Sequence, residues 1–238
     1  MPVSFIRIPA QKQLVGEEKE PIRLTFVPVA HLSKGSPALV RKTIEKEMPQ
    51  YIGLELCRPR LEALVRGGSR SPSLSMAFSH PTTAVMYAAQ QLLGKWWNLK
   101  PGEEMVEALR VARDIQRPVL LLDQDIRLTS KLIEKIPLKE KLGLVFAGGA
   151  PGMGKMNLEK IMEPKNLEIL LSKMEKDFPV TYRVFVSSRN KHMFEKLMKH
   201  EPESAVVIVG AAHVPGLLKL AKESGAKGGR EINAKVAR

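Results

Sequence analysis

Cysteine, aromatic residues and long apolar runs are all scarce in this chain. Its single cysteine, Cys57, can form no internal disulfide, so a reducing compartment fits best. No apolar run approaches the roughly 18–20 residues that a membrane-spanning helix needs. The first residues also lack the apolar stretch of a signal peptide. Together these absences predict a cytoplasmic protein without a membrane span.

Acidic residues are also few. The chain has 25 acidic residues and 38 lysines and arginines, which gives a net charge of +13. Such an excess can attract an anionic partner such as nucleic acid. However, the basic residues are spread along the whole chain and aromatics make up only 5% of it. No basic block interleaved with aromatic side chains stands out, so the pattern favours a solvated lysine-rich surface over a nucleic-acid interface.

Apolar runs of strand length alternate with amphipathic helical segments, which predicts one α/β domain over residues 1–238. The expected strands are Ile22–Val29, Tyr51–Leu56, Pro118–Leu122, Tyr182–Val186 and Ser204–Val209. Such alternation is typical of a mixed, largely parallel sheet flanked by helices. Residues 225–238 are small and basic, and we expect them to form a frayed tail.

Polar residues follow several expected strands, at the edge where parallel sheets bind ligands. His31 and His213 each follow a strand through a turn of small residues, and Asp123 follows the strand at 118–122. Imidazole nitrogens bind zinc, manganese or cobalt and exchange protons near neutral pH. Alternatively, each histidine caps the next helix or makes a hydrogen bond in the core.

Two acidic groups leave similar alternatives open. Glu55 lies inside an apolar run, where an unpaired charge is costly, so either a metal ion or an arginine such as Arg60 would satisfy it. Asp123 and Asp125 could bind a metal, orient a histidine or cap the following helix.

The glycine-rich segment Gly149–Met156 fits the first part of a phosphate-binding P-loop, G-x-x-x-x-G-K. That pattern then requires serine or threonine to hold magnesium, and this chain has Met156 there. A glycine-rich connection is therefore favoured over a nucleotide site.

Four motifs, taken in order, resemble the TraB family, which includes PrgY-like proteins and is related to the Tiki metalloproteases. The motifs are Ala30–Ser36, Leu54–Arg60, Pro101–Met105 leading into Leu122–Thr129, and Val209–Gly216. The resemblance spans about Arg23 to Leu218. It implies an α/β fold shared with erythromycin-esterase-like and ChaN-like proteins, built from two related halves.

The resemblance also implies a site. Its expected ligands for a divalent metal, which could be manganese, cobalt or zinc, are His31, Glu55 and His213. The resemblance implies that Glu104, Asp125 and Arg127 lie nearby. We expect Glu104 or Asp125 to help activate water, and Arg127 or Arg189 to steady an oxyanion or a substrate carboxylate. The expected binding residues are Ser36, Arg60, Asp123 and Gly210.

Departures from the family pattern occur at three motifs. Pro28 stands where the family has the glycine of Gly-x-x-His, and Gln124 stands where it has the arginine of Asp-Arg-Asp. Ser188 and Asn190 replace both acids of an expected Glu-Arg-Asp.

Three functional hypotheses follow. The first is a metal-dependent hydrolase, with peptide cleavage implied by the Tiki relatives. The second, which the lost acids favour, is a PrgY-like protein that binds or sequesters a peptide or small molecule without catalysis. The third, motivated by the charge and the glycine loop, is a nucleic-acid or nucleotide binder. A homodimer is left open as the oligomeric state.

Overall fold

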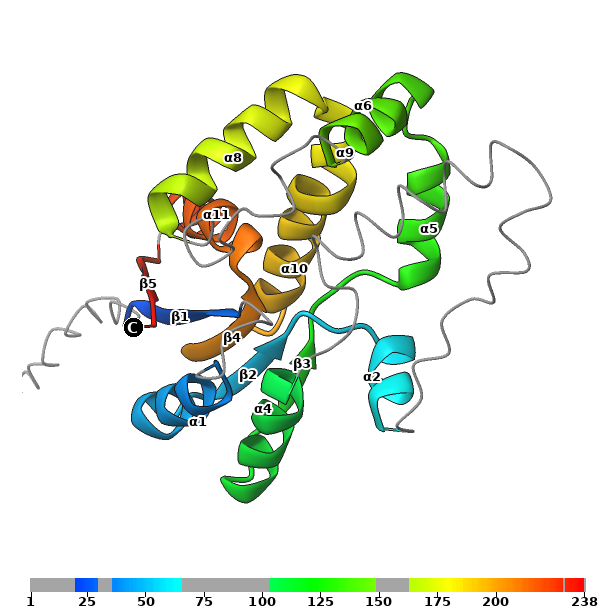
Figure 1. Ribbon diagram of the computed structural model, residues 1–238. Coiled ribbons are helices and arrows are strands. Elements are labelled where there is room, and N and C mark those ends of the chain that lie inside the picture. The colour runs from blue at the N-terminus through cyan, green and yellow to red at the C-terminus, as the bar shows by residue number, and fades with distance from the viewer. Residues whose placement is uncertain (1–19, 30–35, 66–102, 149–162, 229, 238) are drawn as a thin grey trace, which may run out of the picture.

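A single parallel sheet organises the part of the chain that the computed structural model describes, residues 20–29, 36–65, 103–148, 163–228 and 230–237. The strands are β1 (Ile22–Val29), β2 (Tyr51–Leu54), β3 (Val119–Leu121), β4 (Ser204–Gly210) and β5 (Ile232–Val236). They lie in the order β3-β2-β4-β1-β5, and every pairing is parallel (Figure 1). The predicted α/β fold with a sheet flanked by helices is confirmed.

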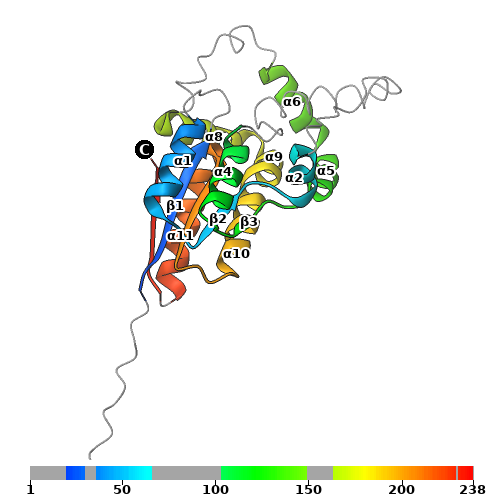
Figure 2. The same cartoon turned by 90° about the horizontal axis from the view of Figure 1, so that it is seen from below.

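Helices cover both faces of this sheet. On one face lie α1 (Ser36–Glu47) and α4 (Glu103–Asp114), which Figure 2 shows in front of the strands. On the other face lie α10 (Ser188–Met198) and α11 (Val214–Gly228). The core beneath α1 and α4 includes Val27, Ile44, Ile52, Met105 and Ile208. The core beneath α10 and α11 includes Phe26, Leu122, Met193, Val207 and Leu217.

A second group of helices packs beside the sheet around a smaller core that includes Ile133, Leu167, Leu171 and Phe185. Its helices are α5 (Ile126–Glu134), α6 (Leu138–Gly148), α8 (Pro164–Asp177) and α9 (Pro179–Tyr182). A short helix, α2 (Arg58–Val65), follows β2. Within the described ranges, no helix combines the length and apolarity needed to cross a bilayer.

The run Tyr182–Val186, expected to be a strand, is helical, so that prediction is wrong. Pro179 begins α9, and a π-helical segment, Arg183–Ser187, leads straight into α10. Val184–Val186 is buried throughout, so no polar position reveals the helical period to a sequence pattern. π-Helical turns are rare and occur often at functional sites.

The expected frayed tail contains a strand, which corrects that prediction. Residues of β5 pair with β1 from Ile22↔Ile232 to Phe26↔Val236. Side chains at 232, 234 and 236 are partly buried and pack against the core beneath α11, whereas those at 233 and 235 are exposed. This alternation has the period of a strand, and the small, basic composition hides it.

Candidate functional site

The carboxyl ends of β2, β3 and β4 bring polar residues together because these strands are neighbours. Leu54 of β2 pairs with Leu121 of β3 and also with β4. Glu55 follows β2, Asp123 follows β3, and His213 ends a short helical turn, Ala211–His213, after β4. The neighbouring strands β1 and β4 lead into α1 and α11 on opposite faces. This reversal marks the crevice where open parallel sheets bind ligands.

Arg189, near the start of α10, joins the ends of two of these strands. Its Nε and Nη2 donate to the two carboxylate oxygens of Asp123, each at 2.9 Å. Nη2 also donates to Oε1 of Glu55 at 2.5 Å. Arg189 is only 3% exposed. Its two-point contact with Asp123 fixes the plane of the guanidinium and, through it, the direction of the Glu55 carboxylate.

Arg60 of α2 completes a buried cluster of charges. Its Nη1 donates to Asp123 Oδ2 at 3.1 Å and to the main-chain oxygen of Glu55 at 3.4 Å. Two arginines therefore face two carboxylates, and the four charges balance. Of the two partners considered for Glu55, an arginine is present, and it is Arg189 rather than Arg60 that reaches the carboxylate.

The second oxygen of Glu55, Oε2, accepts a hydrogen bond from the main-chain N–H of Gly210 at 2.6 Å. A Cβ atom at position 210 would lie 3.2 Å from this oxygen, so glycine lets the carboxylate approach the backbone closely. Gly210 was predicted as a binding residue, and the structure gives its amide this contact with Glu55.

His213 is 1% exposed and lies between Glu55 and α10. Its Nδ1 is 2.6 Å from Oδ1 of Asn190. Its Nε2 is 3.3 Å from Glu55 Oε1, yet it has no hydrogen-bond partner among the described residues. In the sequence, Asn190 stood out only because it replaces an acid of the family pattern. Its position next to Arg189 could have indicated that it also lies at the site.

Burial of Glu55 opposes ionisation of its carboxyl group, but His213, Arg189 and Arg60 together outweigh it. They hold the pKa of Glu55 well below its ordinary value of 4.5. Burial likewise lowers the pKa of Arg189, and Glu55 and Asp123 outweigh it, so the pKa of the guanidinium is raised. Glu55 is therefore a carboxylate and Arg189 a cation at neutral pH.

Replacing Glu55 with glutamine should weaken the dependence of the free energy of unfolding on pH in the acid range. Because the folded pKa lies below the unfolded one, Glu55 stabilises the fold above about pH 4.5. That stabilisation is lost as the pH falls through the folded pKa. Urea unfolding of the metal-free protein between about pH 3 and pH 7 would measure the slope. Glu45→Gln, at an exposed position of α1, should keep the wild-type slope. An equally steep Glu55→Gln profile would contradict this prediction.

The remaining predicted residues are placed less centrally. Asp125 caps α5 by accepting from the N–H of Arg127 at 2.8 Å, and both side chains are exposed. Ser36 begins α1 and Glu104 lies in the first turn of α4, and both are buried. Catalytic or binding roles for these residues stay predictions. His31 and Gly149–Met156 lie outside the described residues.

Gln124, a departure from the family pattern, has a structural contact. Its side-chain Nε2 donates to Thr129 Oγ1 at 2.9 Å, and both residues are buried. This bond ties the end of β3 to α5, next to Asp123.

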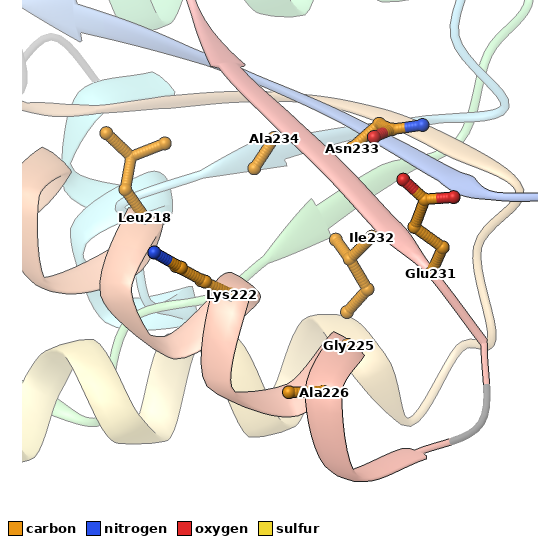
Figure 3. A pocket seen from close by; sticks show the side chains of 8 residues that line it. All are labelled: Leu218, Lys222, Gly225, Ala226, Glu231, Ile232, Asn233 and Ala234. Carbon is orange, nitrogen blue, oxygen red and sulfur yellow. The ribbon is translucent and has the colours of Figure 1, made fainter.

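A groove of about 720 Å³ lies away from these residues, between the last turns of α11 and β5 (Figure 3). Gly225 and Ala226 line it from the helix, and Ile232 and Ala234 from the strand. Because α11 begins at the carboxyl edge of the sheet and runs back along it, this groove lies toward the opposite edge. It adds nothing to the cluster around Glu55.

Comparison with known proteins agrees with the motifs. The model of the TraB/PrgY/gumN family matches residues 19–228. The chain is 26% identical to the uncharacterised protein MJ1365 of Methanocaldococcus jannaschii over 210 residues, covering 83% of this chain and 53% of that protein. It is 26% and 25% identical to the human and mouse TraB domain-containing proteins, covering 87% of this chain and 64% of each relative. The chain thus spans half to under two thirds of these relatives, and it belongs to the TraB/PrgY/gumN family.

Proposed function

We propose that this chain is a hydrolase that uses a divalent cation held by His213 and Glu55. The observation that carries the proposal is the buried Nε2 of His213, which lies 3.3 Å from a carboxylate oxygen and has no hydrogen-bond partner among the described residues. A buried polar atom without a partner is costly in a folded protein. A cation shared with Glu55 would satisfy it.

The donor set fits such an ion. Imidazole nitrogen and carboxylate oxygen are common ligands of zinc and manganese. Two ligands of one tetrahedral ion, with bonds of about 2.0–2.1 Å, are about 3.3 Å apart, which is the separation of Nε2 and Oε1. No group of three histidine, cysteine or acidic side chains suited to a metal occurs among the described residues. His31, the third expected ligand, is not among them.

When bound, a divalent cation would supply Lewis acidity and lower the pKa of a nearby water molecule. The chain's own residues hold the ligands in place for this. Arg189 and the Gly210 amide each hold one oxygen of Glu55. Asn190 holds the ring of His213. Peptides are the substrate class that the likeness to Tiki metalloproteases favours.

Cation binding is the direct test. The chelator-treated protein should bind zinc or manganese in calorimetry, and saturation at about 100 times the Kd should stabilise the fold by about 2.7 kcal/mol. His213→Ala should abolish both effects. His200→Ala removes an exposed histidine and should leave both unchanged. Metal-dependent cleavage of a fluorogenic peptide library would then establish hydrolysis. Equal cation binding by His213→Ala and wild type would refute the proposal.

A second candidate is a protein that binds a peptide or small molecule without cleaving it. The observation in its favour is that amides stand where the family pattern has charged groups, at Gln124 and Asn190, and both are held by other side chains. Neither can accept a proton as a carboxylate can. This candidate predicts peptide binding that survives chelation and His213→Ala.

A further inference from the structure

The contact between Asn190 and His213 determines where the imidazole carries its proton. Nδ1 of His213 and Oδ1 of Asn190 are 2.6 Å apart, and the two residues are 1% and 3% exposed. An amide oxygen can only accept a hydrogen bond, so Nδ1 must be the donor. In a neutral imidazole with a proton on Nδ1, Nε2 carries an unshared electron pair.

The neighbouring helix α11 packs closely against the Asn190 amide. Gly216 of α11 lies so close that a Cβ atom there would be 2.1 Å from Nδ2 of Asn190. The amide nitrogen thus occupies the space that a side chain at position 216 would fill. With Nδ2 directed at Gly216, Oδ1 faces His213.

The position of Asn190 on α10 explains why it reaches this histidine. Successive residues of a helix point about 100° apart. Arg189 is directed at Asp123 and Glu55, after β3 and β2, and Asn190 at His213, after the adjacent β4. The first turn of α10 therefore contacts three neighbouring strand ends with two consecutive side chains.

We infer that Asn190 is a positioning residue that holds Nδ1 of His213 as a hydrogen-bond donor and so directs Nε2 at the Glu55 carboxylate. Nε2 then lies 3.3 Å from Oε1 of Glu55 and has no hydrogen-bond partner among the described residues. Such a pair is a ready ligand site for a cation. The role in cation affinity rests on the proposed function, whereas the tautomer is a property of the metal-free protein.

The tautomer can be measured directly by heteronuclear NMR of the histidine ring nitrogens in chelator-treated protein near pH 7. The chain has five histidines, and the His213 signal is assigned by its loss in His213→Ala. We expect a proton on Nδ1. A ring protonated on Nε2 alone would overturn the inference.

Variants at two positions separate this role from a general packing role. Asn190→Leu keeps the volume and removes the acceptor, so the proton should move to Nε2, toward Glu55. Asn190→Asp restores an acceptor and should keep Nδ1 protonated. Gly216→Ala places a methyl group against the amide nitrogen and should act like Asn190→Leu with Asn190 and His213 intact. It also keeps the test available if Asn190→Leu fails to fold.

Zinc titration of the same variants tests the consequence for the site. Removing a contact that orients a metal-binding histidine typically costs about 10–100-fold in affinity. We expect that loss in Asn190→Leu and Gly216→Ala, and near wild-type binding in Asn190→Asp. If wild type shows the Nδ1–H tautomer but binds no zinc, the proposed function fails and the positioning role stands. If the tautomer is unchanged in both Asn190→Leu and Gly216→Ala, the positioning role is refuted.

Discussion

Arg189→Met is expected to lower the free energy of unfolding by about 3–5 kcal/mol, the usual cost of removing one member of a buried ion pair. Arg189 is 3% exposed, and its guanidinium holds the carboxylates of both Glu55 and Asp123. Without it, two buried anions face Arg60 alone among the cationic members of the cluster. Since domains of this kind are stable by only about 5–15 kcal/mol, a loss of this size is a large fraction of the total. Urea unfolding followed by circular dichroism would measure it.

Two further variants sharpen that experiment. Arg189→Lys retains the charge, but one ammonium cannot reproduce the two-point contact with Asp123 and still reach Glu55, so we expect only partial recovery. Lys191→Met changes an exposed cation on the same helix and should alter stability by less than about 0.5 kcal/mol. A loss below about 1 kcal/mol in Arg189→Met would show that the cluster contributes little to the fold.

Asp123→Asn should lower the free energy of unfolding about as much as Arg189→Met does. Here the cluster loses an anion instead of a cation. Asp123 accepts from both arginines, so neutralising it leaves two buried cations with only Glu55 to balance them. We expect a loss of about 3–5 kcal/mol in the free energy of unfolding. Removing Arg60 as well, in Asp123→Asn/Arg60→Met, restores the balance of one cation and one anion.

The double variant should therefore lose less stability than the sum of its single variants, with a coupling of about 0.5–3 kcal/mol. Arg58→Met supplies the matched control, because Arg58 lies two residues before Arg60 and its side chain is 85% exposed. Combined with Asp123→Asn, it should give an additive result. Additive losses for Arg60→Met would show that charge balance does not govern this cluster.

Much of the sheet could be predicted from the sequence because its central strands are continuous apolar runs. β1 and β4 lie inside the sheet, and their β-branched residues mark them plainly. The run Val184–Val186 has the same composition but lies in a buried helix, where composition cannot distinguish the two structures. The prediction also missed β5, which was expected to be a frayed tail, because an edge strand needs few apolar residues.

The residues that form the site could be predicted better than the contacts between them. Glu55, Asp123 and His213 could be found because they follow adjacent parallel strands. A substrate role for Arg189 stays a prediction, and its contacts with two carboxylates of the chain itself were not predicted. Which arginine pairs with which acid depends on how α10 and α2 pack against the sheet, and that packing brings together residues more than sixty positions apart.

The position of β1 within the sheet has a consequence for how the chain folds during synthesis. β1 contains the first described strand residues, yet the strands on either side of it, β4 and β5, begin at Ser204 and Ile232. At about 5–20 residues per second, a ribosome needs roughly ten seconds or more to proceed from β1 to β4. During that interval β1 has neither of its sheet neighbours. Its apolar residues must therefore be protected by the growing chain or by a chaperone until the C-terminal strands emerge.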